Sequence, residues 1–325
     1  MSSTRREFVC RGAATLVGGL TAPALAFPDR PIVIVDPATP GSSTDIFSRA
    51  LAEELSKVLK SPVIVVNKPG AAGALASEFV ARAPPDGHTL ALVAVSTHAA
   101  NPALNRSLRY DPIRDFAPIT TMVTLPSVIV VASDSPYQTL NALLEAARLR
   151  PGMISYASPG VGSAGHLLLE QFSRLAGVRF LHVPYRGTAA MMNDLFGGQL
   201  NVASDNVSAI LPHIRSGRLR ALAVRDVQRI PQLMDVPVLK ELGFEPVSYP
   251  LWFGLAAPAG TPTDVVLKLN EAAKEAMRRP GFQQRVQDGA ATYSPSSPEQ
   301  FKEQIEQWLE RFRAIVDLAG ITPHE

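Results

Sequence analysis

Short apolar segments alternate with longer amphipathic segments along the first hundred residues. The segments 31–35, 62–66 and 89–95 are apolar runs bounded by Pro, Gly and polar residues, as in strands that are buried on both faces of a sheet. Between the first two runs, residues 46–59 repeat apolar side chains at helical spacing. This alternation of strand and helix predicts an open parallel α/β sheet.

A second group of alternating segments follows in the middle of the chain. We expect its strands at residues 153–157, 179–185, 200–203 and 219–224, with helices between them. The pattern therefore predicts a second α/β unit of about 100 residues.

Two extended segments are predicted to connect these units. Residues 119–132 lead from the first unit to the second, and residues 252–257 return to the first unit, which three C-terminal helices complete. We therefore expect an α/β fold of two lobes joined by two crossing segments around a central cleft, with a hinge. Lobe 1 would comprise residues 27–123 and 248–325, and lobe 2 would comprise residues 124–247.

Polar loops follow the first and third predicted strands. Because ligands of parallel sheets bind outside the carboxyl ends of the strands, the loops at 39–45 and 96–101 are candidates for a binding site. We expect Ser43 or Thr44 to cap the helix after the first loop, since Ser and Thr are common N-cap residues.

A glycine-rich loop follows the first predicted strand of lobe 2. Gly160, Gly162 and Gly165 leave backbone N–H groups exposed, and the next helix adds unpaired N–H donors and the positive end of its dipole. Ser163 adds a hydroxyl, and His166 is a second candidate donor. The loop suits an anion, although a tight turn that needs glycine for its backbone angles explains it equally well.

The same loop fits the dinucleotide-binding pattern G-x-G-x-x-G. In a dinucleotide-binding unit, an Asp or Glu should end the next strand, about 20 residues on, to bind the ribose. Here that strand ends in Tyr185-Arg186-Gly187, with no acid. We therefore interpret the loop as a site for a small anion such as a carboxylate, and we expect no cofactor.

Residues 1–26 have the pattern of an export signal peptide. Arg5 and Arg6 precede a short apolar stretch that ends in Ala24-Leu25-Ala26, a small-residue cleavage pattern. The paired arginines favour the twin-arginine route, but Cys10 stands where that pattern usually has lysine, so a general secretory signal stays open. We expect a periplasmic protein, and an uncleaved N-terminal anchor is the less favoured alternative.

The charge of the exported chain is balanced. Without Arg5, Arg6, Arg11 and Glu7, the totals of 31 basic and 29 acidic residues become 28 and 28. A neutral chain lacks the field that attracts nucleic acid or an anionic membrane surface. The 6 His are scattered, and the single Cys lies in the predicted signal, so we expect neither a metal site nor thiol chemistry.

An enzyme is the main alternative to a binding protein. Ser163 lies in Val161-Gly-Ser-Ala-Gly165, which lacks the first glycine of the hydrolase motif G-x-S-x-G. The order of the chain also assigns no partner His and acid to this serine. A hydrolase or other enzyme on the same two-lobe scaffold is therefore the alternative function.

Short motifs are distributed along the whole exported chain. They are Pro28-Asp-Arg-Pro31, Pro40-Gly-Ser-Ser-Thr-Asp45, Val66-Asn-Lys-Pro-Gly-Ala-Ala-Gly73, Pro85-Asp-Gly-His-Thr-Leu90, Tyr110-Asp-Pro112, Asp115-Phe-Ala-Pro118, Tyr156-Ala-Ser-Pro-Gly-Val-Gly-Ser163 with His166, His182-Val-Pro-Tyr-Arg-Gly187, Gly217-Arg-Leu-Arg-Ala-Leu-Ala223, Trp252-Phe-Gly-Leu255 and Ala257-Pro-Ala-Gly-Thr-Pro262. By the order and spacing of these motifs, the chain resembles the solute receptors of tripartite tricarboxylate transporters, the Bug-type extracytoplasmic binding proteins.

The resemblance implies a fold, a function and a partner. The fold is the type II periplasmic-binding-protein fold, and the function is to capture a small organic acid and deliver it to the membrane permease of the transporter, with no catalysis. Ligands of the family lie between the lobes, held by the loops after the first and third strands and by the glycine loop, partly through backbone amides and ordered water. We expect this receptor to be a monomer.

The resemblance also places the ligand-binding residues, residue by residue. In the first loop they are Thr39, Gly41, Ser42, Ser43, Thr44 and Asp45; in the second loop Ser96, Thr97 and His98; in the glycine loop Ser158, Gly162, Ser163 and His166; and at the cleft edges Tyr185, Gly187 and Asp205. The family usually has Gly at position 42 and often an aromatic residue near position 38, where this chain has Ser42 and Ala38.

Several of these residues have a structural alternative. We favour a role for Asp45 in holding the start of its own helix, because an acid there would repel an anionic ligand. Asp205 would either receive an amine or hydroxyl of the solute or cap the helix after Asn206, and we favour the cap. His98 and Trp252 are more often buried structural residues, and His166 would either face a carboxylate or pack the helix start. Because the loops hold no obvious Lys or Arg, we expect N–H and hydroxyl groups, rather than an ion pair, to bind the carboxylate.

Overall fold

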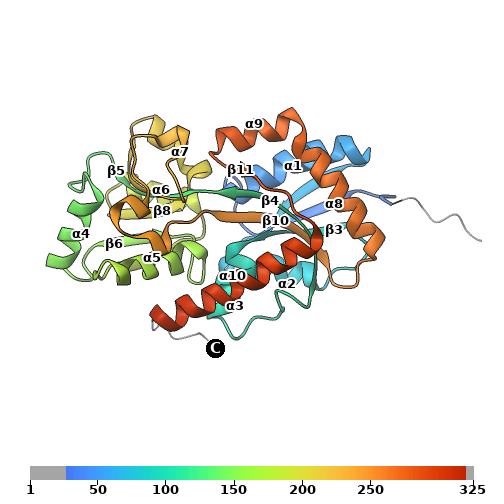
Figure 1. Cartoon of the computed structure of the whole chain (residues 1–325), viewed down its shortest axis with the longest axis horizontal. Helices are drawn as coiled ribbons and strands as arrows, with labels where there is room; N and C mark the ends of the chain where they lie inside the picture. Colours follow the sequence, from blue (N-terminus) through green and yellow to red (C-terminus); the bar gives the residue numbers. More distant parts are fainter. Residues whose placement is uncertain (1–26, 320–325) are drawn as a thin grey trace, which may run out of the picture.

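Two mixed β-sheets form the framework of the computed structural model, which describes residues 27–319. Figure 1 shows them in the two halves of an elongated molecule. The first sheet has the order β11-β4-β10-β3-β1-β2, and its strands are β1 (Ile32–Asp36), β2 (Val63–Asn67), β3 (Thr89–Ala94), β4 (Phe116–Leu125), β10 (Leu251–Pro258) and β11 (Thr292–Tyr293). The second sheet has the order β7-β6-β8-β5-β9, and its strands are β5 (Ser127–Ala132), β6 (Ser155–Ser158), β7 (Leu181–Pro184), β8 (Val202–Asn206) and β9 (Leu219–Arg225).

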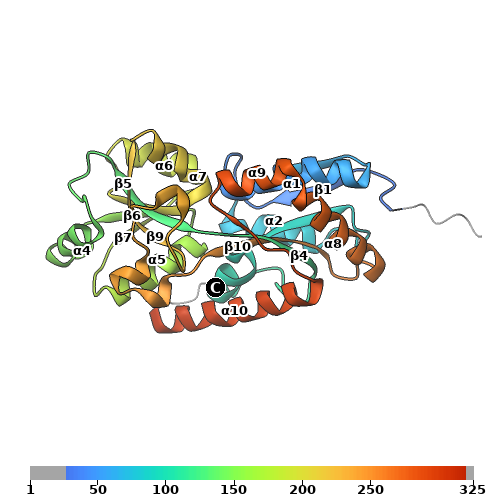
Figure 2. The same cartoon turned by 45° about the horizontal axis from the view of Figure 1, so that its top comes forward.

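Helices cover both faces of each sheet (Figures 1 and 2). Those of the first half are α1 (Ser43–Leu59), α2 (Ala74–Ala81), α3 (Asn101–Leu104), α8 (Thr263–Arg278), α9 (Pro280–Asp288) and α10 (Pro298–Ala319). Those of the second half are α4 (Leu140–Leu149), α5 (Ala164–Leu175), α6 (Thr188–Phe196) and α7 (Val207–Arg215). None of the helices within residues 27–319 is long and apolar enough to cross a membrane. The predicted export signal, residues 1–26, lies outside the described residues.

The prediction of an open parallel sheet is wrong in part. β1 is parallel to β2 and to β3, but β10 is antiparallel to both β3 and β4. The cause is the crossing between the halves, because β4 leads out of the first sheet and β10 leads back into it. The second sheet has the same mixed character, since β5 is antiparallel to its neighbours β8 and β9.

Each sheet is buried between two apolar layers. On one face of the first sheet, Phe47 of α1 packs with Leu269 of α8 and Phe282 of α9. On its other face, the side chains of α2 and α10 form a second layer. The second sheet is covered by α4 and α5 on one face and by α6 and α7 on the other. These layers make the strand ends, rather than the strand faces, the accessible part of each sheet.

The C-terminal helix α10 packs against both halves of the molecule. Phe301 and Phe312 of α10 share a cluster with Trp252 of β10 and with Leu167 and Leu168 of α5. Figure 2 shows α10 running along one side of the molecule beneath the two crossing strands. Trp252 is 1% exposed and is a core residue, as its apolar surroundings in the sequence suggest. The helix therefore fixes the start of α5 relative to the first sheet.

Gly254 allows α10 to approach the crossing strand β10 closely. A Cβ atom at this position would lie 2.6 Å from the carbonyl oxygen of Thr120 on β4 and closer still to the ring of Phe301. We therefore predict that Gly254→Ala lowers the free energy of unfolding by about 2–3 kcal/mol, because an overpacked core must shift. Equilibrium unfolding in urea measures this loss.

The matched control is Gly197→Ala, at the end of α6. Gly197 has φ −83°, and its added Cβ would lie 3.4 Å from the nearest atom. This variant should unfold within about 0.5 kcal/mol of the wild type. Equal effects of the two substitutions would contradict the close packing of α10 on β10.

Candidate functional site

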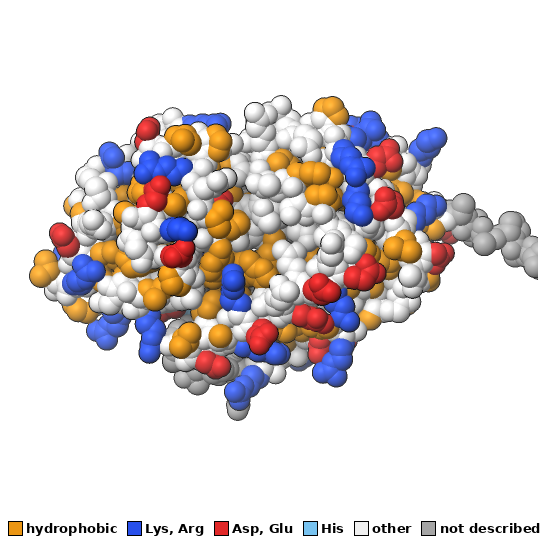
Figure 3. Space-filling model, in the orientation of Figure 1, with side chains coloured by type: hydrophobic (Ala, Val, Ile, Leu, Met, Phe, Trp, Pro, Cys, Tyr) orange, Lys and Arg blue, Asp and Glu red, His pale blue; other side chains and the backbone are white. Residues whose placement is uncertain are grey.

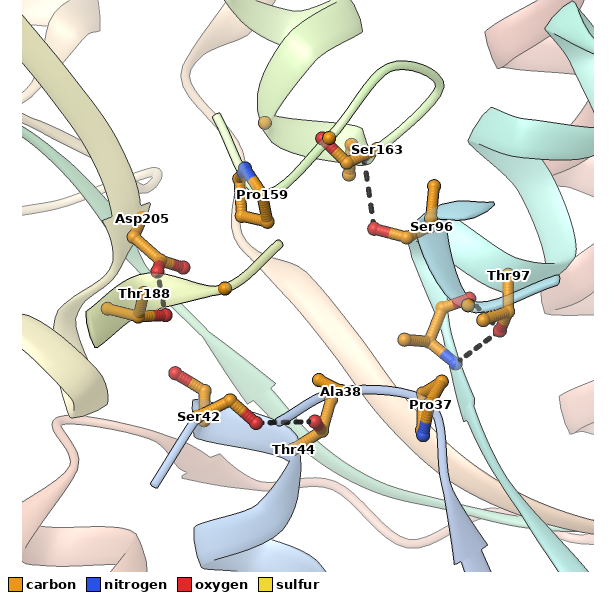
Figure 4. A pocket seen from close by; sticks show the side chains of 18 of the residues that line it. Pro37, Ala38, Ser42, Thr44, Ser96, Thr97, Pro159, Ser163, Thr188 and Asp205 are labelled. Carbon is orange, nitrogen blue, oxygen red and sulfur yellow. Dashed lines mark hydrogen bonds between the residues drawn. The ribbon is translucent and has the colours of Figure 1, made fainter. Parts of the chain in front are cut away.

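A cavity of about 830 Å³ lies between the two sheets. Its walls are the segments that follow the carboxyl ends of strands: residues 37–39, 69–73 and 94–97 after β1, β2 and β3, and residues 159–161 and 184–188 after β6 and β7. Figure 4 shows side chains from both halves facing the same space. The strand-end rule therefore brings loops that are more than 100 residues apart to one place.

Four helices begin at the wall of this cavity. Thr44 lies in the first turn of α1, Ala164 opens α5, Thr188 opens α6, and Asn206 is the N-cap residue of α7. The first N–H groups of a helix have no partner within the helix, and the helix dipole places partial positive charge there. The convergence of four such ends places partial positive charge at the cavity wall without requiring a charged side chain.

The first loop is held by the buried carboxylate of Asp36. Its Oδ1 accepts hydrogen bonds from the Ala38 N–H and the Thr44 hydroxyl, each at 2.9 Å, and its Oδ2 accepts one from the Ser48 hydroxyl at 2.6 Å. Burial raises the pKa of Asp36 to about 6, although these hydrogen bonds oppose the rise. Asp36 is therefore a structural anchor for the loop.

The hydrogen bonds of Asp36 fix the direction of the neighbouring hydroxyl protons. Thr44 has a single hydroxyl proton, which it donates to Asp36. The contact of 3.0 Å between Ser42 Oγ and Thr44 Oγ1 must therefore be donated by Ser42. When Asp36 is ionised, neither hydroxyl has a proton left for a ligand. The other donors of this loop are the N–H groups at the start of α1 and the hydroxyls of Thr39 and Ser43, and the Ser43 hydroxyl also accepts from Ser208 at 2.8 Å.

The N-cap of α1 differs from the prediction. Ser42 is the N-cap, and its Oγ accepts a hydrogen bond from the Asp45 N–H at 3.3 Å. The expectation of Ser43 or Thr44 is therefore wrong by one or two residues, because three consecutive hydroxyl residues all qualify by type. Asp45 binds the Gly41 N–H and Arg49, each at 2.9 Å. Asp45 is therefore committed to the loop and the helix, and neither it nor Gly41 lines the cavity.

The backbone of the glycine loop contacts the first half of the molecule. The Ala164 N–H donates to Ser96 Oγ at 3.0 Å, while Ser163 is the N-cap of α5 and accepts from the His166 N–H at 3.2 Å. Gly162 has φ +78° and faces the side chain of Asn101, where a Cβ would lie 3.0 Å from the amide oxygen. The loop therefore needs glycine both for its backbone angles and for its close contact with the first half.

Three aromatic rings stack behind the glycine loop. The ring of His182 lies 4.7 Å from that of Tyr156 and 4.1 Å from that of His166, in near-parallel planes. His182 Nε2 lies 2.7 Å from Ser158 Oγ, and the Gly162 N–H donates to His166 Nδ1 at 3.3 Å. Ser158, Gly162 and His166 therefore support the loop from behind, and none of them lines the cavity.

His98 also lies outside the cavity lining. A short π-helical turn, Ser96–Ala100, turns its side chain into the core, where its ring lies 4.6 Å from that of Phe116. Its exposed fraction is 0%, and burial lowers its pKa to about 3. His98 is therefore a neutral core residue, in line with its structural alternative, and it does not line the cavity.

The structure thus divides the predicted site residues into two groups. Ten of the sixteen line the cavity: Thr39, Ser42, Ser43, Thr44, Ser96, Thr97, Ser163, Tyr185, Gly187 and Asp205. The other six lie behind it: Gly41, Asp45, His98, Ser158, Gly162 and His166. The lining group contributes backbone N–H groups, hydroxyl side chains and one acid, and the group behind it positions the loops.

Asp205 contributes an acid to the cavity wall. Its Oδ2 accepts a hydrogen bond from the Thr188 hydroxyl at 2.6 Å, and its Oδ1 accepts one from the Asn206 N–H at 2.7 Å. Burial raises the pKa of Asp205, against these two hydrogen bonds. The carboxylate therefore links the starts of α6 and α7, which is the helix-holding alternative.

Several residues of the cavity wall are not among the sixteen predicted site residues. Two are arginines, the exposed Arg186 at the end of the β7 loop and the buried Arg225 at the end of β9. Arg225 lies beside Ser127, the first residue of β5, and that serine lies beside Asn206 at the end of β8. The signal that could have found Arg225 is its place at the carboxyl end of a predicted strand. Within residues 27–319, no cluster of three or more His, Cys, Asp or Glu side chains could hold a metal ion.

Two α/β halves around a cavity ringed by helix N-termini define a solute-binding protein. Residues 47–321 match the family described as the tripartite tricarboxylate transporter family receptor, and the chain belongs to this family. Family members are periplasmic substrate-binding receptors, and the chain is accordingly a receptor and not an enzyme. Ser163, the candidate nucleophile of the hydrolase alternative, is the N-cap of α5.

Three relatives show how far the similarity extends. Protein BugT of Bordetella pertussis is 33% identical over 312 residues, which are 95% of this chain and 96% of that protein. MatC from Rhodopseudomonas palustris, solved with bound malate, is 30% identical with a TM-score of 0.85 over 89% of this chain and 100% of that chain. A second R. palustris protein, solved with adipate, is 32% identical with a TM-score of 0.88 over 92% of this chain and 100% of that chain. These matches confirm the family and the periplasmic-binding-protein fold.

The half-buried His182 predicts a pH dependence of stability. Burial lowers its pKa to about 4 from an ordinary value of 6.5. The unfolded chain therefore binds the proton at a higher pH than the folded chain does, and the free energy of unfolding falls as the pH drops from 6.5 to 4, by up to about 3 kcal/mol. In His182→Phe, which keeps an aromatic ring in the stack, this contribution should vanish.

Urea unfolding of both proteins at pH 8 and at pH 4.5 measures the effect. At pH 8, His182→Phe should be less stable by about 1 kcal/mol because it lacks the contact with Ser158. At pH 4.5 the difference should shrink or reverse. If the difference between the two proteins stayed constant with pH, His182 would not carry a depressed pKa.

Proposed function

We propose that this receptor captures a small organic acid in the cavity and delivers it to the permease of a tripartite tricarboxylate transporter. The observation that carries the proposal is the convergence of the starts of α1 and α5, from opposite halves, on one cavity. Helix N-termini stabilise an anion through N–H donors that need no reorganisation on binding. Support also comes from two similar proteins of Rhodopseudomonas palustris, one solved with bound malate and the other with adipate.

We further propose that the halves act as two lobes, residues 27–123 with 248–325 and residues 124–247, which close over the solute. Contacts across the cavity support a closed form. The Ser208 hydroxyl donates to Ser43 Oγ at 2.8 Å, and the Ala164 N–H reaches Ser96 as described above. Gly187 lies so close to Thr39 that a Cβ there would collide with the threonine hydroxyl. The hinge would lie where the two crossing segments leave the first sheet.

The proposed cellular setting follows from the family and the N-terminal pattern. Residues 1–26 would direct export to the periplasm, by the twin-arginine or the general secretory route, and the exported receptor would act there as a monomer. Basic and acidic side chains are interspersed over the visible face in Figure 3, with no field of one sign. Such a surface favours recognition of the permease by shape and local pairs rather than by net charge.

Thermal unfolding of the purified protein against a panel of acids tests the ligand class. The panel comprises malate, adipate, tricarboxylates, amino acids and aromatic acids, with the neutral diamides of malate and adipate as controls. A ligand at about 100 times its dissociation constant adds about 2.7 kcal/mol of stability, a shift of several degrees. Carboxylates should raise Tm and diamides should not. Unfolding, dialysis and refolding remove any ligand that copurifies with the protein. If the refolded protein still responds to no carboxylate, the proposal is contradicted.

Ser163 offers a direct test of the cavity. The variant Ser163→Phe places an aromatic ring in the cavity at the start of α5 and should abolish binding of the carboxylates found in the panel. Its control is Ser163→Ala, which loses the same helix cap, worth about 1 kcal/mol, but adds no bulk. Ser163→Ala should weaken binding by about tenfold or less, the value of one hydrogen bond. Isothermal titration measures the affinity of both variants for these carboxylates. Unchanged affinity in Ser163→Phe would place the solute elsewhere.

A further inference from the structure

Arg225 is a cation in the wall of the cavity that the family resemblance does not place there. It is the last residue of β9, and its sheet neighbour is Ser127, which also lines the cavity. Its exposed fraction is 1%, and it is among the largest fully buried side chains of the protein. A fully buried arginine at a cavity wall calls for a partner, because an unpaired charge is strongly disfavoured away from water.

The described residues supply hydrogen-bond partners for only some of the N–H groups of this guanidinium. Nη1 donates to the Ser127 hydroxyl at 2.9 Å, while Nε and Nη2 are buried and have no hydrogen-bond partner within residues 27–319. Burial lowers the pKa of Arg225 to about 10, so the group remains protonated at neutral pH. Two N–H donors on one edge of a charged fork are thus left for a partner that the chain does not supply.

The nearby polar groups do not neutralise this charge. Asp205 on β8, which β5 separates from β9, binds Thr188 and the Asn206 N–H. Asp226, the next residue in the chain, binds the Val227 N–H at 2.6 Å. The phenol of Tyr249 interacts electrostatically with Arg225, but burial raises the pKa of this phenol, so it is neutral at pH 7. No ion pair of Arg225 with a described carboxylate exists within 4.0 Å.

We propose that the Nε and Nη2 edge of Arg225 binds a carboxylate of the captured solute as a two-point ion pair. The planar guanidinium matches the two oxygens of a carboxylate, and such pairs are strongest where water is excluded. This inference rests on the proposed function and deepens it. The sequence led us to expect binding by neutral donors alone. In this proposal, Arg225 supplies a positive charge and the helix starts supply N–H donors.

A consequence concerns the protein without its solute. A buried guanidinium with a single hydrogen bond destabilises the empty receptor, whereas a methionine of similar length would fill the same space with apolar atoms. The variant Arg225→Met should therefore be at least as stable as the wild type without ligand and should bind carboxylates much more weakly. A residue that served the fold alone would give the opposite result on stability.

The experiment compares Arg225→Met and Arg225→Lys with the wild type. The matched control is Arg220→Met, which makes the same substitution on β9 at an exposed position outside the cavity lining. Isothermal titration with malate and adipate at pH 7.5 gives the affinities, and thermal unfolding without ligand gives Tm. We expect Arg225→Met to weaken carboxylate binding by about 100-fold or more, with Arg225→Lys intermediate and Arg220→Met within about twofold of the wild type.

The outcomes separate this inference from the proposed function. If the wild type binds malate or adipate and Arg225→Met binds the same acid within threefold, the ion pair is overturned and the receptor function stands. A lower ligand-free Tm in Arg225→Met, with no recovery of affinity in Arg225→Lys, would assign Arg225 a structural role and also overturn it. If the wild type binds no carboxylate of the panel, the proposed function fails first. Loss of affinity with unchanged or raised Tm supports the ion pair.

Discussion

The antiparallel pair of strands β4 and β10 is the constraint on which the rest of the structure depends. These strands are the two crossings between the halves, and they share eight paired positions from Leu251 to Pro258. Because one strand leaves the first sheet and the other returns, the pair sets how the two sheets face each other. Helix α10 packs on this pair and on α5, so the glycine loop at the start of α5 is held relative to the first loop. The cavity is a product of that geometry.

Local patterns in the sequence predict the elements well and their directions poorly. Every strand predicted from an apolar run is found within about three residues of its expected place, because an apolar run bounded by turn residues is a strong signal even for the partly exposed strands β2 and β7. The direction of β10 is not a local property, since it depends on the chain having crossed to the second half and back. The N-cap of α1 was misplaced for a different reason. Ser42, Ser43 and Thr44 are equally suitable by type, and only the folded loop, in which Thr44 binds Asp36 and Ser42 accepts from the Asp45 N–H, distinguishes them.

In the site, too, the positions of the loops are predictable from the sequence, whereas the burial of individual side chains is not. The loops at the cavity follow from the strand-end rule, which needs only strand positions. His98 has the right position in such a loop, but the π-helical turn buries it. Arg225 has the right chemistry but lies on a strand, so a search for cations confined to the loops overlooks it. Burial, which decides both cases, is a tertiary property.

The charged side chains in and behind the cavity wall have different tasks. Asp36 and Asp205 are saturated by hydroxyl and N–H donors from their own surroundings. Arg225 is left with two free donors. A paired acid rigidifies the loop that it binds, whereas an unpaired cation destabilises the empty form and gains on binding. The stability that the protein forgoes at Arg225 is thus a source of affinity for an anion.

The hydroxyl groups around Asp36 limit which donors are available to the anion. Since the protons of Thr44 and Ser48 go to Asp36 and the proton of Ser42 goes to Thr44, these oxygens cannot donate to a solute while Asp36 is ionised. A carboxylate near the first loop must therefore be met by backbone N–H groups, whose direction is fixed by α1, or by the hydroxyls of Thr39 and Ser43, which lie outside this network. Protonation of Asp36, whose pKa is about 6, would release the Thr44 proton and reorder the chain of hydroxyls. The receptor thus binds its solute with donors that the fold has already oriented, and the ionised Asp36 keeps that orientation in place at neutral pH.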